Sequence, residues 1–197
     1  MSEPYRVCVV CTGNICRSPM GEFILRELFE EAGLGDRVVV DSAGTTSWEV
    51  GNPADPRTLA VLERNGHADF GGREHVARAF EHGWLAERDL VLAADRGHAS
   101  TLRSYARTPE DAAKVRLFRS FDPAAGEDAE MPDPWYGGQD GFVTTLATME
   151  RAMPGLADAV RRLSGRDRAV RRRFLRHQPA RGRLDGPAAA AGPRGGL

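Results

Sequence analysis

Cysteine is scarce in this chain of 197 residues, and its three copies, Cys8, Cys11 and Cys16, lie together near the N-terminus. An odd number of cysteines in one short stretch argues against a framework of disulfides. A structural zinc site usually needs four Cys or His ligands, and no second cysteine pair or closely spaced His pair follows. The cysteines therefore indicate either a reactive thiol or packing in the core.

Long hydrophobic runs are also missing. The longest apolar stretches span a few residues, far fewer than the roughly 18 that a membrane-spanning helix needs. The run 7–10 is too short for the apolar core of a signal peptide, so we expect a cytoplasmic protein. With 41% hydrophobic and 28% charged residues, the composition is typical of one ordinary globular domain.

The net charge of -1 hides an uneven distribution of charge. Residues 161–197 hold eleven Arg against two Asp, a balance of +9, whereas residues 1–160 carry -10. Lys114 is the single lysine, so a compositional bias in the coding sequence would also explain the many arginines. A tail of this charge attracts polyanions, but Phe174 is its only aromatic residue. We therefore expect no specific nucleic-acid binding and, at most, contact with anionic surfaces.

Strands and helices are predicted to alternate along the chain. Apolar runs predict strands over 6–11, 38–40, 89–94 and 115–121. Periodic patterns predict helices from Ser18 to just before Gly33, from Pro56 to just before Gly66, over 96–107 and over about 141–163. The first has Ser18 as N-cap, and the last is kinked or interrupted near Pro154. This alternation favours a single α/β domain in residues 1–164, with a four-stranded parallel sheet and helices on both faces. We expect residues 165–197 to form a disordered tail.

The turn between the first predicted strand and helix reads Cys11-Thr12-Gly13-Asn14-Ile15-Cys16-Arg17-Ser18. Open α/β sheets bind ligands at such turns, where backbone N–H groups and the positive end of a helix attract an anion. Arg17 adds a planar cation that can hold two phosphate oxygens at once. The same field stabilises a thiolate, so we expect Cys11 to be a nucleophile at neutral pH.

A thiolate beneath an anion-binding loop suits phosphoryl transfer through a cysteinyl-phosphate. The hydroxyl of Ser18 can hydrogen-bond to the Cys11 sulfur and help it leave. Gly13 permits close approach of the backbone to a ligand, and Asn14 tolerates a left-handed conformation. A Cys and an Arg six residues apart are weak evidence alone, but the complete motif between strand and helix favours catalysis over packing.

This loop, with Pro19 after it, closely resembles the signature loop of the low-molecular-weight protein tyrosine phosphatases. Further similar segments follow in order, at 41–45, Trp48, 55–57, 75–78, 89–95 and 133–137. The resemblance covers about residues 5–164. It implies a phosphate-binding loop after the first strand of a four-stranded parallel sheet, and hydrolysis of phosphotyrosine in protein substrates without a metal or another cofactor.

The resemblance also implies roles for individual residues. Asp133, held in an extended loop between Pro132 and Pro134, is expected to protonate the leaving phenolate and then to activate water. The phosphate is expected to contact the loop residues Thr12, Gly13, Asn14, Ile15 and Cys16, and the tyrosine ring to contact Trp48, Trp135 and Tyr136.

Other residues are implied to support the loop. Asn14, Ser18, Ser42 and His75 match a hydrogen-bond network that holds its shape, although His75 alone would be taken for a surface residue. Cys16 matches a second cysteine that can form a disulfide with Cys11 and protect it from further oxidation, but packing would also explain it. Cys8 is expected to lie in the core.

Three alternatives were weighed. Arsenate reduction by thiol relay needs further cysteines downstream of the loop, and residues 17–197 contain none. Phosphoarginine hydrolases resemble this loop but carry Thr where this chain has Ile15, whose larger apolar surface suits an aromatic ring. A binding module without activity would lack some of the chemical groups, and all of them are present. The sequence therefore predicts a phosphotyrosine phosphatase.

Overall fold

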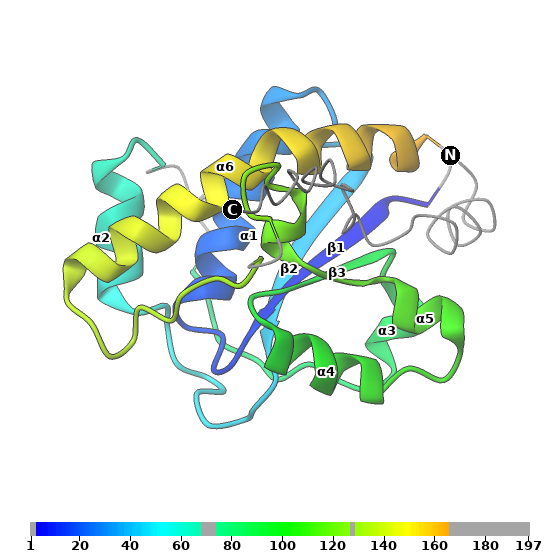
Figure 1. Cartoon of the computed structure of the whole chain (residues 1–197), viewed down its shortest axis with the longest axis horizontal. Coiled ribbons are helices and arrows are strands. Elements are labelled where there is room, and N and C mark those ends of the chain that lie inside the picture. The colour runs from blue at the N-terminus through cyan, green and yellow to red at the C-terminus, as the bar shows by residue number, and fades with distance from the viewer. Residues whose placement is uncertain (1–2, 68–73, 127–128, 166–197) are drawn as a thin grey trace, which may run out of the picture.

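Four parallel strands form the centre of the fold. In the computed structural model, which describes residues 3–67, 74–126 and 129–165, they lie in the order β2-β1-β3-β4 (Figure 1). The strands are β1 (Tyr5–Cys11), β2 (Val38–Gly44), β3 (Leu90–Ala93) and β4 (Val115–Leu117). From β1 the chain proceeds to β2 on one side, and β3 pairs with β1 on the other side. The loop after β1 therefore lies where the strand order reverses, the place at which open α/β sheets bind ligands.

Helices cover both faces of this sheet (Figure 1). On one face lie α1 (Arg17–Glu31) and α6 (Gln139–Ser164), with α2 (Pro56–Arg64) packed against them. On the other lie α3 (Trp84–Glu87), α4 (Arg96–Ser104) and α5 (Pro109–Ala113). Alternate residues of β1 enter the two layers of core: Val7 and Val9 pack on the α1 side, and Cys8 and Val10 on the α4 side. The predicted fold class is confirmed, and Cys8 is a core residue.

Two details of the predicted elements are wrong. Ser18 is not the N-cap of α1, because the helix begins at Arg17 and its cap residue, Cys16, makes no capping bond through its side chain. The predicted strand 115–121 ends at Leu117, and Phe118–Phe121 forms a short 3-10 helix, η1, that buries Phe118 in the core. An apolar run of this length predicts either conformation equally well.

Helix α6 continues through Pro154 without interruption. The helix packs closely on η1 at this point, because a Cβ on Gly155 would lie 2.2 Å from the Phe121 carbonyl oxygen. Apolar residues before and after the proline, Met149 and Leu156, are fully buried, so packing compensates for the backbone hydrogen bond that proline removes. No helix in the described ranges is both long and apolar enough to cross a lipid bilayer. The predicted disordered tail lies outside the described residues, except for Gly165.

Candidate active site

Cys11 lies at the end of β1, at the carboxyl edge of the sheet, and its side chain is buried at 2% exposure. The next five residues, 12–16, form a loop that leads into α1. We call residues 11–17 the phosphate loop. Its carbonyl oxygens are bound by neighbouring segments: those of Cys11, Thr12, Asn14 and Ile15 accept hydrogen bonds from Thr45 N (2.8 Å), Thr46 N (3.1 Å), His75 Nε2 (2.7 Å) and Asp55 N (2.8 Å).

The N–H groups of the phosphate loop, unlike its carbonyl groups, are not bound by neighbouring segments. In the described part of the chain, no backbone N–H of residues 13–16 donates to a protein acceptor. Successive backbone N–H groups next to a helix N-terminus form a concave binding site for an anion. The loop that follows Cys11 therefore combines bound carbonyls with available backbone donors.

Two backbone features fix the shape of the loop. Asn14 has φ of 62°, the left-handed conformation that asparagine tolerates, and is fully buried. Gly44, at the end of β2, packs directly against the loop backbone. A Cβ at this position would lie 2.6 Å from the Thr12 carbonyl oxygen, so a side chain cannot fit without displacing the loop.

Side chains from α1 and β2 support the loop from behind. The Asn14 amide nitrogen donates to Ser18 Oγ (2.9 Å) and to Ser42 Oγ (2.8 Å). Ser18 Oγ in turn lies 3.0 Å from Cys11 Sγ. The structure thus brings together Cys11 and three of the residues that the resemblance assigns to loop support.

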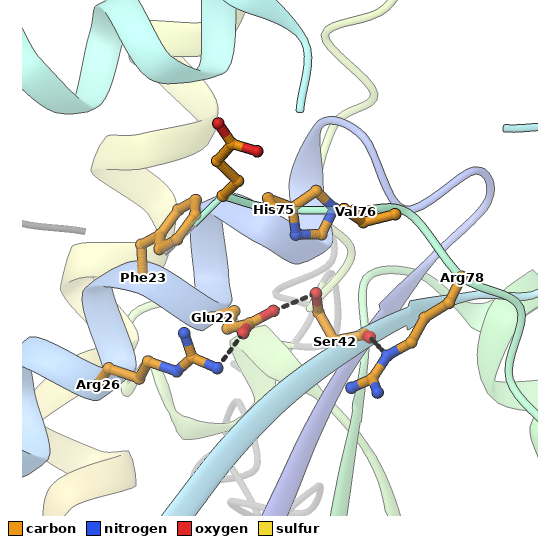
Figure 2. Close-up of a pocket in the computed structure, with 8 residues that line it drawn as sticks. Glu22, Phe23, Arg26, Ser42, His75, Val76 and Arg78 are labelled. Carbon is orange, nitrogen blue, oxygen red and sulfur yellow. Dashed lines mark hydrogen bonds and ion pairs between the residues drawn. The ribbon is translucent and has the colours of Figure 1, made fainter. Parts of the chain in front are cut away.

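His75, the fourth of these residues, closes the network at the Asn14 carbonyl. A carbonyl oxygen only accepts, so Nε2 of His75 carries the proton of this 2.7 Å bond. Burial lowers the pKa of His75, which favours the neutral ring. Figure 2 shows His75 above Ser42 and Glu22, on the wall of a cavity of about 260 Å³ behind the phosphate loop.

Arg17, the first residue of α1, is buried at 3% exposure and makes contacts with both nitrogen arms. Nη1 donates to Asp95 Oδ2 (3.1 Å) and to the Met131 carbonyl (3.3 Å). Nη2 donates to Asp133 Oδ2 at 2.7 Å, and lies 3.5 Å from Thr12 Oγ1. The guanidinium therefore connects the phosphate loop with the segment that carries Asp133.

Asp95 and His98 belong to this site, although the sequence analysis did not assign them to it. Asp95 caps α4 and accepts the His98 backbone N–H (2.9 Å), while His98 Nε2 lies 2.9 Å from Thr12 Oγ1. The ring Nδ1 of His98 also lies 2.9 Å from Asp95 Oδ1, off the axis of a hydrogen bond. Burial raises the pKa of Asp95, but the contacts with His98 and the charge of Arg17 outweigh it and hold this pKa well below its usual range.

A signal for Asp95 exists in the sequence. It follows the third predicted strand directly, and the carboxyl ends of parallel strands lie at one edge of the sheet. No comparable pattern indicates His98.

The loop that carries Asp133 lies at the rim of the site. Asp133 Oδ1 accepts the backbone N–H of Trp135 (3.1 Å), and its side chain is 38% exposed. The predicted aromatic residues are exposed as well, Trp135 at 44%, Trp48 at 78% and Tyr136 at 93%. Their rings are thus accessible to a ligand at the surface and do not form a closed pocket.

Arg57, at the start of α2, connects to the same loop. It donates to both carboxylate oxygens of Asp55 (3.0 and 2.8 Å), and its Nη1 donates to the carbonyls of Trp135 (3.4 Å) and Gly137 (3.2 Å). Its guanidinium lies 5.5 Å from the centre of the Trp135 ring and 4.6 Å from that of Phe142. No pattern in the sequence indicates a role for this side chain.

Cys16 has an environment different from that of Cys11. It is buried, and its Sγ donates to Asp55 Oδ2 at 3.8 Å. Burial and the nearby Asp55 carboxylate raise the pKa of the Cys16 thiol, which therefore stays protonated. All three cysteines are free thiols. Within the described ranges, His, Cys, Asp and Glu side chains do not gather in groups of three or more that could hold a metal ion.

Comparisons with known proteins agree with this geometry. A family model described as "Low molecular weight phosphotyrosine protein phosphatase" matches residues 6–165. A low molecular weight protein-tyrosine-phosphatase of Streptomyces coelicolor is 56% identical over 158 residues, which cover 80% of this chain and 94% of the relative. The low molecular weight protein-tyrosine phosphatase A of Mycobacterium tuberculosis is 44% identical over 166 residues, covering 81% and 94%. A crystal structure of a protein tyrosine phosphatase from Entamoeba histolytica, with Hepes in its active site, superposes with a TM-score of 0.73 at 26% identity, covering 80% and 97%.

Proposed function

Because this chain belongs to the low molecular weight phosphotyrosine protein phosphatase family, we propose that Cys11, Arg17, Ser18 and Asp133 carry out its reaction at the loop after β1. The protein is a protein tyrosine phosphatase, which hydrolyses phosphotyrosine in protein substrates in two steps through a cysteinyl-phosphate. The assignment of residues rests on one observation above others. Cys11 is followed directly by a loop whose backbone N–H groups, at residues 13–16, donate to no protein acceptor within the described ranges.

In the first step, Sγ of Cys11 attacks phosphorus, and the bond between phosphorus and the tyrosine oxygen breaks. The N–H groups of residues 13–16 and the guanidinium of Arg17 hold the non-bridging oxygens as their charge changes. Asp133 gives its proton to the departing phenolate oxygen. Tyrosine leaves, and the phosphoryl group stays on the sulfur.

In the second step, water attacks the phosphoryl group from the side that tyrosine has left. Asp133, now ionised, takes a proton from that water. The sulfur–phosphorus bond breaks, and the sulfur leaves as a thiolate that the Ser18 hydroxyl stabilises at 3.0 Å. Inorganic phosphate is released.

The ion pair between Arg17 and Asp133 supports a change of partner for Arg17 when the substrate binds. Arg17 Nη2 lies 2.7 Å from Asp133 Oδ2, although both residues are assigned to the same phosphoryl group. The incoming phosphate dianion replaces the Asp133 carboxylate on Arg17. Asp133 is then free to carry the proton that the phenolate needs.

The exposed rings of Trp48, Trp135 and Tyr136 support an aryl substrate presented on a protein surface. Ile15 adds an apolar side chain next to Cys16, whose thiol is proposed to form a disulfide with Cys11 under oxidation. Phosphoarginine hydrolysis is the second candidate, and Ile15 disfavours it. The test is phosphate release from peptides with phosphotyrosine, phosphoserine or phosphoarginine, with Cys11→Ser as the control. Faster release from phosphoarginine than from phosphotyrosine would overturn the proposed substrate class.

We further propose that residues 1–164 form the catalytic domain, that the protein acts in the cytoplasm, and that the basic residues beyond it contact anionic surfaces. Residues 165–197 hold nine Arg against two Asp, a balance of +7, which supports the last proposal. A chain that ends at Gly165 should bind anionic vesicles more weakly than the full chain, and added salt should reduce the difference. Equal binding by both chains would contradict a role for the tail.

A further inference from the structure

A chain of hydrogen bonds links the nucleophile to a buried carboxylate on the far side of the phosphate loop. From Cys11 it runs through Ser18, Asn14 and Ser42 to Glu22, which is 7% exposed and forms an ion pair with Arg26 on α1. Figure 2 shows its outer end, where Glu22 lies between Ser42 and Arg26. The proposed chemistry above does not use Glu22.

The backbone fixes the orientation of the Asn14 amide at the centre of this chain. The N–H of Arg78 can only donate, and it lies 3.0 Å from the side-chain oxygen of Asn14. The amide nitrogen must therefore face the two serines, to which it donates both of its protons. Rotating the amide by half a turn would place the nitrogen against the N–H of Arg78.

The direction of the remaining bonds follows from this orientation. Ser18 Oγ accepts from Asn14, and its other polar contact in the described part of the chain is Cys11 Sγ. Its own proton therefore points to the sulfur, which is the direction that stabilises a thiolate. In the same way, Ser42 Oγ accepts from Asn14 and donates its own proton to Glu22 Oε2.

Glu22 has to be a carboxylate for this pattern to hold. Its Oε2 accepts from Ser42, and its Oε1 faces Nη2 of Arg26, so both oxygens face donors. A glutamine has one oxygen and one N–H group. With its oxygen toward Arg26, its nitrogen would face a Ser42 hydroxyl that already accepts from Asn14, and the Ser42 proton would lose its acceptor. With its oxygen toward Ser42, its nitrogen would face Nη2 of Arg26, so in either orientation one of the two donors loses its acceptor.

We propose that Glu22 is a positioning residue for Cys11: by accepting the Ser42 proton, its carboxylate keeps the Ser42 oxygen as an acceptor for Asn14. Together with the N–H of Arg78 it thereby holds the amide that makes Ser18 donate to the sulfur. This inference rests on the proposed role of Cys11 as nucleophile. Besides Ser42, the charged or titratable groups around Glu22 in the cavity are Arg26 on its own helix and Glu74, His75 and Arg78 on the segment that follows α2. Arg26 pairs with Glu22 and also donates to the Val40 carbonyl, whereas Arg78 is held by the Ser42 carbonyl and by Asp41 (3.0 Å).

The test is the Glu22→Gln variant, which keeps the size of the side chain and removes one acceptor. Two properties are measured: kcat on a phosphotyrosine peptide, and the rate of Cys11 alkylation by iodoacetamide as a function of pH. All three cysteines fall in one tryptic peptide, 7–17, so fragmentation of that peptide must locate the label. We expect kcat to fall about tenfold, because a buried donor is left without an acceptor. We expect the midpoint of the alkylation profile to rise by about one pH unit, because the thiolate loses part of its stabilisation.

Glu30→Gln is the matched control, since Glu30 is an exposed carboxylate on the same helix, and it should leave both measurements unchanged. Ser18→Ala should raise the alkylation midpoint by itself, and adding Glu22→Gln should raise it no further, because Glu22 acts through Ser18. If Glu22→Gln does not fold, Ser42→Ala interrupts the same chain one bond further along and should shift the profile in the same direction.

A Glu22→Gln variant with a lower melting temperature but an unchanged alkylation profile would reduce Glu22 to a structural role and overturn the proposal. If the alkylation midpoint of the double variant Ser18→Ala with Glu22→Gln shifted by the sum of the two single shifts, that would also overturn it. Cys11→Ser separates this inference from the proposed function. Turnover by Cys11→Ser would refute the function itself, whereas an inactive Cys11→Ser beside an unshifted Glu22→Gln would refute only the role of Glu22.

Discussion

Substitution of Arg57 tests how Asp133, the proposed general acid, is held in place. Its guanidinium joins the start of α2 to the Asp133 loop through the carbonyls of Trp135 and Gly137 and through stacking on the Trp135 ring. Replacing it by methionine keeps most of the length and apolar surface of the side chain and removes every donor. Asp133 itself is unchanged, so a loss that grows with the basicity of the leaving phenol indicates that its loop has moved.

The expected loss can be worked from these contacts. The two hydrogen bonds are long, at 3.4 and 3.2 Å, and the side chain is about a third exposed. Each is therefore worth roughly 0.5–1 kcal/mol, and the stacking on Trp135 adds about 0.5 kcal/mol. A total of about 2 kcal/mol reduces the fraction of molecules with Asp133 in place by up to about 30-fold.

The assay is kcat/KM, which reports the steps up to release of the phenol, on a series of aryl phosphates whose leaving phenols become more basic. A weakly basic phenolate leaves without a proton, so Arg57→Met should change its release by less than about twofold. Release of the most basic phenolate should slow by roughly 10- to 30-fold, in the same sense as in Asp133→Ala. Arg64→Met, an exposed arginine on the same helix, is the matched control. Equal slowing for all leaving groups, or none, would refute the reasoning.

Three further predictions concern the loop, the packing of helices and the chemistry of the site. Gly44→Ala should lower kcat/KM by more than about 100-fold, because its Cβ would meet the Thr12 carbonyl at 2.6 Å; near-normal kinetics would show that the loop can shift freely. His67 contacts Glu27 and Glu150; burial lowers its pKa, but these carboxylates outweigh burial and raise it. Charged His67 therefore adds less than about 1 kcal/mol to the free energy of unfolding, because the pair with Glu150 is exposed. This stabilisation should be complete below about pH 6.5 and be lost as the pH rises through the raised pKa of His67. Melting temperatures of His67→Gln and the parent should therefore converge at alkaline pH, and a constant gap would contradict the assignment. Dialysis against EDTA should leave kcat unchanged, since Arg17 and the loop N–H groups supply the positive charge; a loss restored by a divalent ion would contradict this.

The main elements of the fold could be predicted because their signals are local. The β-branched run before Cys11, the glycine after α1 and Pro56 at the start of α2 each lie within the element that they define or next to it. The short helices α3 and α5 are missed because four or five residues are too few to show a helical period. Whether residues 118–121 form a strand or a 3-10 helix depends on burial of Phe118 against α1 and α6, which no local pattern contains.

The residues of the site also fall into those with a local signal in the sequence and those without one. Cys11 and Arg17 could be predicted because the sequence itself places them on either side of one tight loop. Asp95 has a signal, its position directly after a predicted strand, but Arg57 and Glu22 could not be assigned, since each looks like an ordinary charged residue in a helix. Their contacts with the site arise only when distant segments meet at the carboxyl edge of the sheet. The wrong capping role of Ser18 has the same origin, because its hydroxyl is used by Cys11 and Asn14.

The central claim is that Cys11 itself receives the phosphoryl group. The most direct measurement is rapid acid quenching of the enzyme during turnover of a phosphotyrosine peptide, followed by mass spectrometry of peptide 7–17 to locate the phosphate. Phosphate on the sulfur of Cys11, absent from Cys11→Ser, is the predicted result. Continued turnover with no phosphate on that sulfur, or with phosphate on another residue, would contradict it.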